Sequence, residues 1–364
     1  MGKLERFLTE YFDGQSSYLY ARGTTALYAL FKRLYSIKGN GEVVIPAICC
    51  ETVALAVLYA GLRPVIADVD AKTLCISYNS VLEELSDNTV ALVLVHIFGN
   101  QFDPTPFQKL KDDHDILIVE DIAQAVGGHD RGQRLGRRYD FTLLSFHDTK
   151  ILKGHGGALI QRNPAYGSFL ESSEIPLPPS PPPHILKLKE QSFRNHVHSL
   201  FDLSRADPSV DISQVFRSMI AHYKDMFIRD ASAFEEDYII NQLQEIDDDQ
   251  QRRHEKYLLY KKLIENEELQ VIDYKPGTTC WRLPILVKDS VNTFHLTALL
   301  RRHGILASNH YFPLDKLLFN TFHRNSGDIG SRIINLWVDD TLSIDQIRKT
   351  ADLLNSYQPI AFEL

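Results

Sequence analysis

The first 160 residues of this 364-residue chain alternate short apolar runs with segments of helical spacing. Apolar residues recur at helical spacing over 24–34, the run 52–59 reads as a helix that Gly61 ends, and a polar helix is expected around 106–114. The run 90–99 is apolar at almost every position, as expected of a central strand that is covered on both faces. Strands that alternate with helices build a mostly parallel, doubly wound sheet, so the sequence predicts an α/β fold. The expected strands are 42–47, 64–70, 90–99, 116–121, 141–147 and 156–160.

The rest of the chain predicts a smaller unit. Residues 235–264 read as one long helix whose mixed face favours a connection between domains over a coiled coil. Ser343 and Gln346 form a capping box at the start of the last helix. We therefore predict a large α/β domain over residues 1–240, and a long helix with a small α+β domain over 241–364. Its expected strands are 280–287, 304–312 and 333–338, and its expected helices are 297–302 and 343–354.

The middle of the chain is rich in proline. Six of the sixteen prolines lie between Pro176 and Pro183, which excludes a helix interior or a central strand there. We interpret this stretch as a loop in an insertion over about 165–230, with a proline-rich ligand for a partner domain as the alternative. His196 and His198 follow without Cys or carboxylate at metal-ligand spacing, so a surface or core role is favoured over a metal site.

Charge and cysteine content narrow the class of protein. Lys and Arg number 39 against 47 Asp and Glu, a formal charge of −8 without any basic block. We therefore expect no general binding to nucleic acid or membrane surfaces. No apolar run reaches the roughly 18–20 residues that span a bilayer, and the charged N-terminal stretch predicts no secretory signal. The four cysteines form no C-x-x-C pair, so a reduced, cytoplasmic compartment is expected.

Residues suited to phosphate binding precede the helix predicted at 24–34. Open α/β sheets bind ligands at the carboxyl ends of their strands, where helices begin. In the run RGTT, Gly23 and Thr24 would leave free N–H groups at a helix N-terminus, which favours a phosphate. An ordinary N-cap at Thr24 is the alternative.

A carboxylate ends the strand predicted at 116–121. Asp121 at a buried strand end needs a cationic or hydrogen-bonding partner. A metal, a helix cap and a protonated ring nitrogen each satisfy that need, and capping is the simplest of them. Gln124 follows one turn later and is expected to point into the same cleft.

A lysine lies between the strand at 141–147 and a glycine-rich turn. Most lysines occupy solvated faces, but a lysine in a cleft beside another cation has a lowered pKa and attacks aldehydes to form a Schiff base. Lys150, with Ser145 before it and Gly156-Gly157 after it, is a candidate for this chemistry. Pyridoxal 5'-phosphate needs a lysine for its aldehyde, a carboxylate for its ring nitrogen and a helix N-terminus for its phosphate. A dinucleotide-binding protein is disfavoured because no G-x-G-x-x-G follows the first strand.

These motifs resemble those of one enzyme family. The run VEDIAQAVGG, the spaced residues Gly132, Gly136 and Asp140, and the run LLSFHDTKILKGHGGALI are similar to the DegT/StrS aminotransferases. The resemblance extends through RGTTAL, EVVIPA and VHIFGN, and weakly into NLWVDDTLSIDQI. It implies a fold-type I pyridoxal-phosphate enzyme, and in this family most members aminate nucleotide-linked keto sugars.

The resemblance also implies residue roles. Lys150 is expected to form the Schiff base and to shuttle protons, and Asp121 to pair with the pyridinium nitrogen. Gln124 is expected at the 3-hydroxyl of the ring. Gly23, Thr24 and Ser145 are expected at the phosphate. The implied reaction is a ping-pong transfer from an amino donor, commonly L-glutamate, to a nucleotide-linked keto sugar in a homodimer.

The chain departs from the family at three places. Cys50 stands where members often carry an aromatic residue that stacks on the ring, and Arg22 stands where they carry Ser. The stretch FIRDASAFEED (227–237) lacks the Asn that reaches the partner's phosphate, and Arg229 is a candidate substitute. These changes keep two alternatives open: a family member that acts as a binding or regulatory protein, and a pyridoxal-phosphate sugar dehydratase. Dehydratases carry His where this chain has Lys150, so transamination is favoured.

Overall fold

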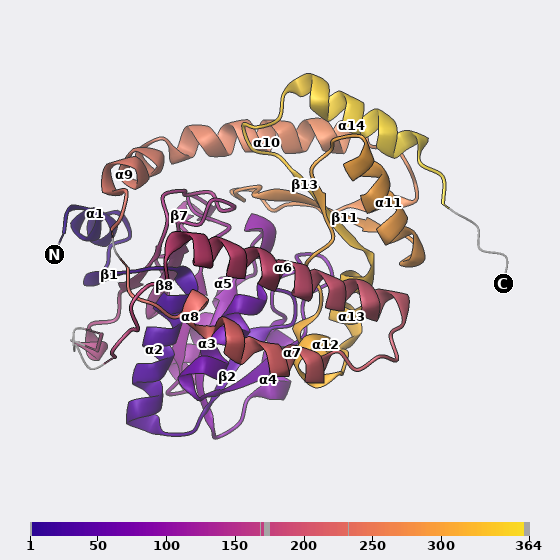
Figure 1. Ribbon diagram of the computed structural model, residues 1–364. Helices are drawn as coiled ribbons and strands as arrows, with labels where there is room; N and C mark the ends of the chain where they lie inside the picture. Colours follow the sequence, from indigo (N-terminus) through magenta and orange to yellow (C-terminus); the bar gives the residue numbers. More distant parts are fainter. Residues whose placement is uncertain (1, 168, 171–174, 232, 360–364) are drawn as a thin grey trace.

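The computed structural model describes residues 2–167, 169–170, 175–231 and 233–359 (Figure 1). Within these residues the chain forms a seven-stranded sheet, a four-stranded sheet and a two-stranded hairpin. The hairpin consists of β6 (His129–Asp130) and β7 (Gln133–Arg134). Three short 3₁₀ helices, η1 (Ile97–Gly99), η2 (Pro164–Tyr166) and η3 (Ala221–Tyr223), lie in connections.

The large sheet has the order β1-β9-β8-β5-β4-β2-β3. Strands β3, β2, β4, β5 and β8 run parallel to one another, and β9 is antiparallel to both of its neighbours, β8 and β1. The predicted mostly parallel α/β sheet is therefore confirmed. Only β1, an edge strand with a single buried side chain, escaped prediction. The bounds are β1 (Ser16–Tyr20), β2 (Glu42–Pro46), β3 (Arg63–Ala67), β4 (Thr89–Val95), β5 (Leu117–Asp121), β8 (Phe141–Ser145) and β9 (Gly157–Gln161).

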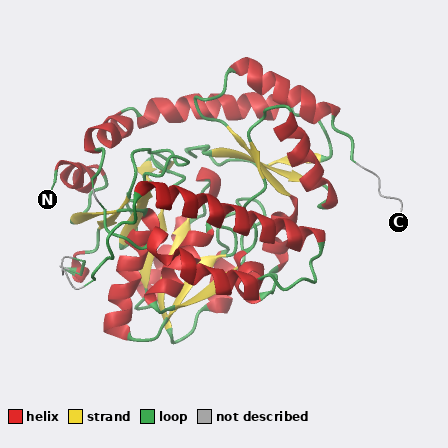
Figure 2. Cartoon of the chain, viewed as in Figure 1, coloured by secondary structure: helices red, strands yellow, loops and turns green. Residues whose placement is uncertain are grey.

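Helices cover both faces of this sheet (Figure 2). Side chains alternate across a strand, so Val93 and Val95 of β4 enter one core while Leu92 and Leu94 enter the other. The first core also holds the apolar faces of α2 (Gly23–Lys38) and α3 (Glu51–Ala60). The second core holds those of α1 (Lys3–Tyr11), α4 (Tyr78–Glu84) and α5 (Pro104–Asp113).

The proline-rich stretch leads into helices that the sequence analysis did not predict. The chain contains no helix or strand from 175 to Pro182, but α6 (Pro183–Ala206) begins at Pro183, where the missing N–H of proline costs nothing. Phe193, Phe201 and Phe227 of α6 and the following helices belong to the same core as α2 and α3. The loop interpretation of the proline-rich stretch is therefore confirmed up to Pro182 and is wrong at Pro183. Helix α6 crosses the front of the large sheet in Figure 1. The following helices are α7 (Ser213–Ile220) and α8 (Lys224–Phe227).

The single long helix predicted over 235–264 is divided. α9 (Glu236–Gln244) and α10 (Ile246–Leu263) meet at Glu245, whose backbone angles are φ −97° and ψ 7°. Leu243 and Ile246 are buried with the large sheet, whereas Tyr257 and Tyr260 of α10 are buried in the core of the small one. The change of direction lets one stretch of apolar residues serve two cores.

The small sheet is antiparallel, with the order β10-β11-β13-β12. The predicted strand over 304–312 shrinks to β12, because the chain leaves the sheet after Ser308. The capping box is confirmed: Ser343 Oγ accepts the Gln346 N–H at 3.2 Å, and Gln346 Oε1 accepts the Ser343 N–H at 2.8 Å. The domain boundary at 240 stays a prediction. The bounds are β10 (Leu269–Val271), β11 (Arg282–Val287), α11 (Val291–Arg302), β12 (Ala307–Ser308), α12 (Leu314–Phe319), α13 (Arg324–Arg332), β13 (Ile333–Trp337) and α14 (Ile344–Ser356).

Candidate functional site

Asp121 ends β5, with Val95 of β4 and Leu143 of β8 paired beside it. The side chain is buried, and its Oδ1 accepts the N–H of Ala123 at 2.9 Å. Burial raises the pKa of Asp121, while the Ala123 N–H, Lys150 and His96 oppose that rise. Turns rather than a helix follow Asp121, so it is not a helix cap. The carboxyl group is thus suited to pairing with a cationic group in the cleft.

His96 lies beside Asp121 and was missed by the sequence analysis. Its Nε2 contacts Glu120 Oε1 at 3.1 Å, its Nδ1 contacts the Asn100 carbonyl at 3.1 Å, and its ring stacks on Phe102. The imidazole therefore occupies one oxygen of Glu120 and is held on both nitrogens. Asp121, in contrast, retains acceptor capacity beyond its turn contact.

Lys150 lies in the loop after β8. Its backbone N–H donates to the His147 carbonyl at 2.7 Å, and its Nζ lies 5.2 Å from the centroid of the Trp281 ring, within range of a cation–π contact. Trp281 Nε1 donates to the Thr149 carbonyl at 3.0 Å, so the indole positions the lysine loop. Lys150 also acts electrostatically on Asp121 and opposes the rise in the pKa of that carboxyl group.

Gln124 connects the large sheet to the segment after β12. Its Oε1 accepts the Phe98 N–H at 2.6 Å, and its Nε2 donates to the Tyr311 hydroxyl at 2.8 Å. Burial raises the pKa of Tyr311, which keeps the phenol neutral. Tyr311 was not identified from the sequence because the run 304–312 reads only as an apolar strand.

The backbones of α2, β8 and β9 approach one another closely at the N-terminus of α2. The helix begins at Gly23 with Arg22 as N-cap, so the N-cap predicted as an alternative at Thr24 is wrong. A Cβ at Gly23 would lie 3.3 Å from Ser145 Cβ and 3.6 Å from Ser145 Oγ. A Cβ at Gly157 would collide with the Gly23 nitrogen. The first turn of α2, with its free N–H groups, therefore lies next to the Ser145 hydroxyl. We call the space between Gly23 and Ser145 the Gly23–Ser145 cradle. Glycines line this space, and larger residues at their positions would crowd it.

Cys50 is the N-cap residue of α3, and Lys150 acts electrostatically on its thiol. Its Sγ lies 3.1 Å from Thr52 Oγ1 and 3.8 Å from Glu51 Oε2. Burial raises the pKa of the Cys50 thiol to about 11. The thiol is therefore protonated at neutral pH and is a small wall group rather than a nucleophile.

Glu190 of α6 links two residues near the cradle. Its Oε1 lies 2.8 Å from His147 Nε2 and 3.4 Å from Arg22 NH2. The hydrogen bond from His147, with help from Arg22, lowers the pKa of Glu190 to about 2. Arg229 NH1 donates to Ser180 Oγ at 3.1 Å, and burial is the largest cause of its lowered pKa.

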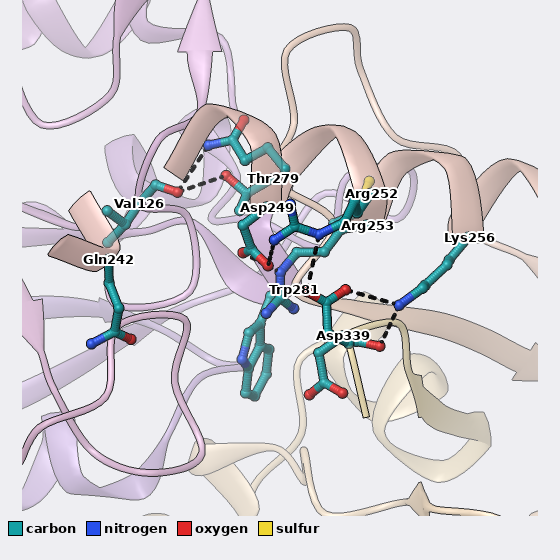
Figure 3. Close-up of polar contacts among 12 residues, drawn as sticks. Val126, Gln242, Asp249, Arg252, Arg253, Lys256, Thr279, Trp281 and Asp339 are labelled. Carbon is teal, nitrogen blue, oxygen red and sulfur yellow. Dashed lines mark hydrogen bonds and ion pairs between the residues drawn. The ribbon is translucent and has the colours of Figure 1, made fainter. Parts of the chain in front are cut away.

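Helix α10 fixes the segment that carries Trp281. Figure 3 shows Asp249, Arg253 and Lys256 of α10 near Asp339 and Trp281. Arg253 Nε donates to Asp249 Oδ2 at 2.6 Å, and Lys256 Nζ donates to the Asp339 carbonyl at 2.8 Å. The same segment reaches the large sheet where Thr279 Oγ1 donates to the Val126 carbonyl at 3.4 Å.

The part of the chain that the structure describes contains no group of three or more His, Cys, Asp or Glu side chains arranged to hold a metal ion. No helix within that part combines the length and the apolar composition that crossing a bilayer requires.

Curated proteins that are similar to this chain include a synthase and an aminotransferase. The GDP-perosamine synthase of Vibrio cholerae is 27% identical over 164 residues, 44% of each chain. The L-glutamine:2-deoxy-scyllo-inosose aminotransferase of Streptomyces kanamyceticus is 30% identical over 152 residues, 42% of this chain and 36% of its own. The matches thus span less than half the length of these relatives.

Solved structures extend the likeness of the fold to the whole chain. Helicobacter pylori PseC, described as an aminotransferase of pseudoaminic acid biosynthesis, superposes with a TM-score of 0.74 at 20% identity, over 96% of this chain and 89% of its own. The PLP-form of the sugar aminotransferase Spr1654 from Streptococcus pneumoniae gives 0.72 at 18% identity, over 97% and 90%. The family model for DegT/DnrJ/EryC1/StrS aminotransferases matches residues 1–171, which carry Gly23, Asp121, Gln124, Ser145 and Lys150. Over residues 1–171, this chain is thus similar to the DegT/DnrJ/EryC1/StrS aminotransferase family.

Proposed function

We propose that the protein is a pyridoxal-phosphate-dependent aminotransferase that moves an amino group from L-glutamate to a nucleotide-linked keto sugar. One observation carries the proposal: a buried carboxylate, a lysine and a glycine-lined helix N-terminus meet at one edge of the large sheet. Asp121, Lys150 and the Gly23–Ser145 cradle come from three different strand or helix ends. The match of residues 1–171 to the family supports it.

The residues fit the proposed cofactor. A Cβ would fill the Gly23 cradle, so the space beside Ser145 Oγ is kept for a ligand group such as a phosphate. Asp121 has an oxygen beyond its contact with Ala123 and sits where burial would strengthen an ion pair with a ring N–H. The side-chain amide of Gln124 is fixed in orientation, because its Oε1 accepts the Phe98 N–H and its Nε2 donates to the Tyr311 hydroxyl.

Three side chains of this protein would have separate roles in the proposed reaction. Bound pyridoxal phosphate would supply an electrophilic aldehyde and an electron-accepting ring. Lys150 Nζ would hold the aldehyde carbon and later carry the proton between donor and acceptor carbons. Asp121 would keep a proton on the ring nitrogen, and Trp281 would hold the lysine loop through Thr149.

The names of relatives support the substrate class. One relative is named UDP-N-acetyl-3-dehydro-alpha-D-glucosamine 3-aminotransferase and is 32% identical over 142 residues, 38% of each chain. A nucleotide-linked keto sugar as acceptor accords with that name. A homodimer in the cytoplasm, with Arg229 standing in for the family's Asn, completes the proposal.

Covalent labelling tests the proposal. Borohydride reduction of the protein incubated with pyridoxal phosphate should fix the cofactor on Lys150, as identified by peptide mapping, and Lys150→Ala should abolish labelling. Lys153→Ala, three residues along the same loop, should label like the wild type. In a separate sample that has not been reduced, L-glutamate should convert the bound cofactor to its amino form. Labelling at another lysine, or none, would overturn the proposal, and an unreduced bound cofactor that no amino donor converts would leave a binding protein.

A further inference from the structure

The lysine loop, which connects β8 to β9 and carries Lys150, is held by side chains from the C-terminal half of the chain. Trp281 Nε1 donates to the Thr149 carbonyl at 3.0 Å. The side-chain amide of Gln242 in α9 accepts the Lys153 N–H at 2.9 Å and donates to the Lys153 carbonyl at 2.7 Å. Neither contact reaches the part of the loop that precedes Thr149.

The imidazole of His147 holds that earlier part. The backbone N–H of Thr149 donates to His147 Nδ1 at 3.3 Å, so Nδ1 carries no hydrogen and the hydrogen lies on Nε2. Nε2 then donates to Glu190 Oε1 at 2.8 Å. The carbonyl of His147 accepts the Lys150 N–H at 2.7 Å. One residue thus connects α6 to the backbone of both Thr149 and Lys150.

Helix α6 is a firm support for Glu190, because an apolar face fixes the helix. Phe193 and Val197 follow Glu190 by three and seven residues and are buried in the core of the large sheet. The ring centroid of Phe193 lies 4.9 Å from that of Phe227. The side chain of Glu190 itself is 32% exposed, and ion pairs at such positions contribute little to folding stability. Removal of its carboxylate should therefore leave the fold intact.

Two arginines orient the carboxylate of Glu190. Arg22 NH2 lies 3.4 Å and Arg194 NH2 3.9 Å from the same Oε1 that accepts the His147 hydrogen bond. The guanidinium of Arg22 in turn lies over the Phe227 ring, 5.6 Å from its centroid. The pKa of Glu190, lowered to about 2 by the His147 hydrogen bond and by Arg22, keeps the group ionised and able to accept.

We propose that Glu190 is a positioning residue for the lysine loop, and that it acts through the imidazole of His147. The carboxylate fixes the imidazole, the imidazole fixes the Thr149 N–H, and the His147 carbonyl fixes the N–H of Lys150. Helix α6 lies outside the residues 1–171 that the family model matches, so the anchor of the loop belongs to the other part of the chain. That the positioned amine serves pyridoxal phosphate rests on the proposed function.

Backbone hydrogen exchange of the full-length protein tests this anchor without any cofactor. In Glu190→Ala the amides of Thr149 and Lys150 should exchange about three- to tenfold faster than in the wild type, the effect of losing one hydrogen bond. Glu190→Gln retains an oxygen that accepts the Nε2 hydrogen, so its rates should stay close to those of the wild type. Gln191→Ala, at the exposed next residue, should match the wild type. Melting temperatures establish that each variant is folded.

Loading with pyridoxal phosphate tests the consequence for the amine. The rate at which the cofactor becomes reducible on Lys150 should fall by a similar factor in Glu190→Ala, at an unchanged melting temperature, and Glu190→Gln should restore it. His147→Ala should slow loading at least as much. The double variant should be no slower than His147→Ala alone, because Glu190 acts through that imidazole.

Three outcomes would refute the inference. They are wild-type exchange in Glu190→Ala, exchange in Glu190→Gln as fast as in Glu190→Ala, and additive losses in the double variant with His147→Ala. A wild type that takes up no cofactor on Lys150 would count against the proposed function alone, because the exchange measurement needs no cofactor.

Discussion

At the scale of single residues, the candidate site depends on contacts between positions far apart in the chain. Trp281 and Thr149 are separated by 132 positions, and Tyr311 and Gln124 by 187. Asp121, Gln124 and Lys150 were identifiable because each lies within a motif at a strand end. Trp281 and Tyr311 were not, because side chains that complete a site from another unit leave no local pattern.

His323 gives a prediction at this scale. Its Nδ1 lies 2.8 Å from the buried Asp315 carboxylate, and this hydrogen bond raises the pKa of His323 to about 9. Stability gained from a raised histidine pKa is fully present below the ordinary value near 6.5 and is lost as pH rises toward 9. We expect the urea midpoint to fall between these pH values.

Two variants test whether His323 causes the expected fall in the urea midpoint. His323→Gln should remove most of the decline in the urea midpoint between pH 6.5 and 9, while His114→Gln, at an exposed histidine, should retain it. An identical decline in both variants would assign the pH dependence to another group.

At the scale of elements, the sequence predicted the buried strands well but did not predict where some helices begin and end. The apolar runs predicted six of the seven strands of the large sheet, because buried strands need continuous apolar sequence. The sequence did not indicate that Glu245 divides α9 from α10, because the apolar spacing continues across it. Nor did it place Arg22 rather than Thr24 at the N-cap, since both precede the same stripe.

Gly157→Ala tests the close approach at the cradle. The added methyl group would meet the Gly23 nitrogen and come within 2.7 Å of the Arg22 carbonyl carbon, so β9 and α2 must separate. Overpacking of this kind costs about 1–3 kcal/mol of unfolding free energy, and the affinity for pyridoxal phosphate should fall at the same time. Denaturant titration and cofactor titration measure the two effects.

Gly327→Ala is the matched control. Gly327 lies within α13, and an added Cβ there would make ordinary contacts of 3.4 Å or more with Phe322. Alanine in a helix is favoured over glycine by about 1 kcal/mol, so this variant should be neutral or more stable. Comparable losses in both variants would remove the case for a tight cradle.

At the scale of the whole molecule, the segment from Pro183 to Ile228 is a layer of the large domain rather than an appendage. Phe227 is buried, and the centroid of its ring lies 4.9 Å from that of Phe193. Its backbone carbonyl accepts a hydrogen bond from the Thr25 hydroxyl at 2.6 Å. The sequence analysis did not predict that this segment packs on the large sheet, because the prolines that precede α6 are typical of a loop. The same segment brings Glu190 into contact with His147 and Arg22.

Phe227→Ala tests this role. Removal of a fully buried phenylalanine should lower the free energy of unfolding by about 3–5 kcal/mol, whereas Phe294→Ala, at a side chain 54% exposed, should change it by about 0.5 kcal/mol or less. Equilibrium unfolding in urea measures both. A small loss in Phe227→Ala would mean that the segment 183–228 is dispensable for the core.

The indole of Trp281 has a consequence for movement. Trp281 immediately precedes β11 of the small sheet, yet its Nε1 holds the carbonyl next to Lys150. A rotation of the small sheet that preserves this bond must carry the lysine loop with it. Movement of the small sheet and displacement of the Lys150 amine are then a single motion, so a ligand held by that amine would lose the contact whenever the small sheet turns away.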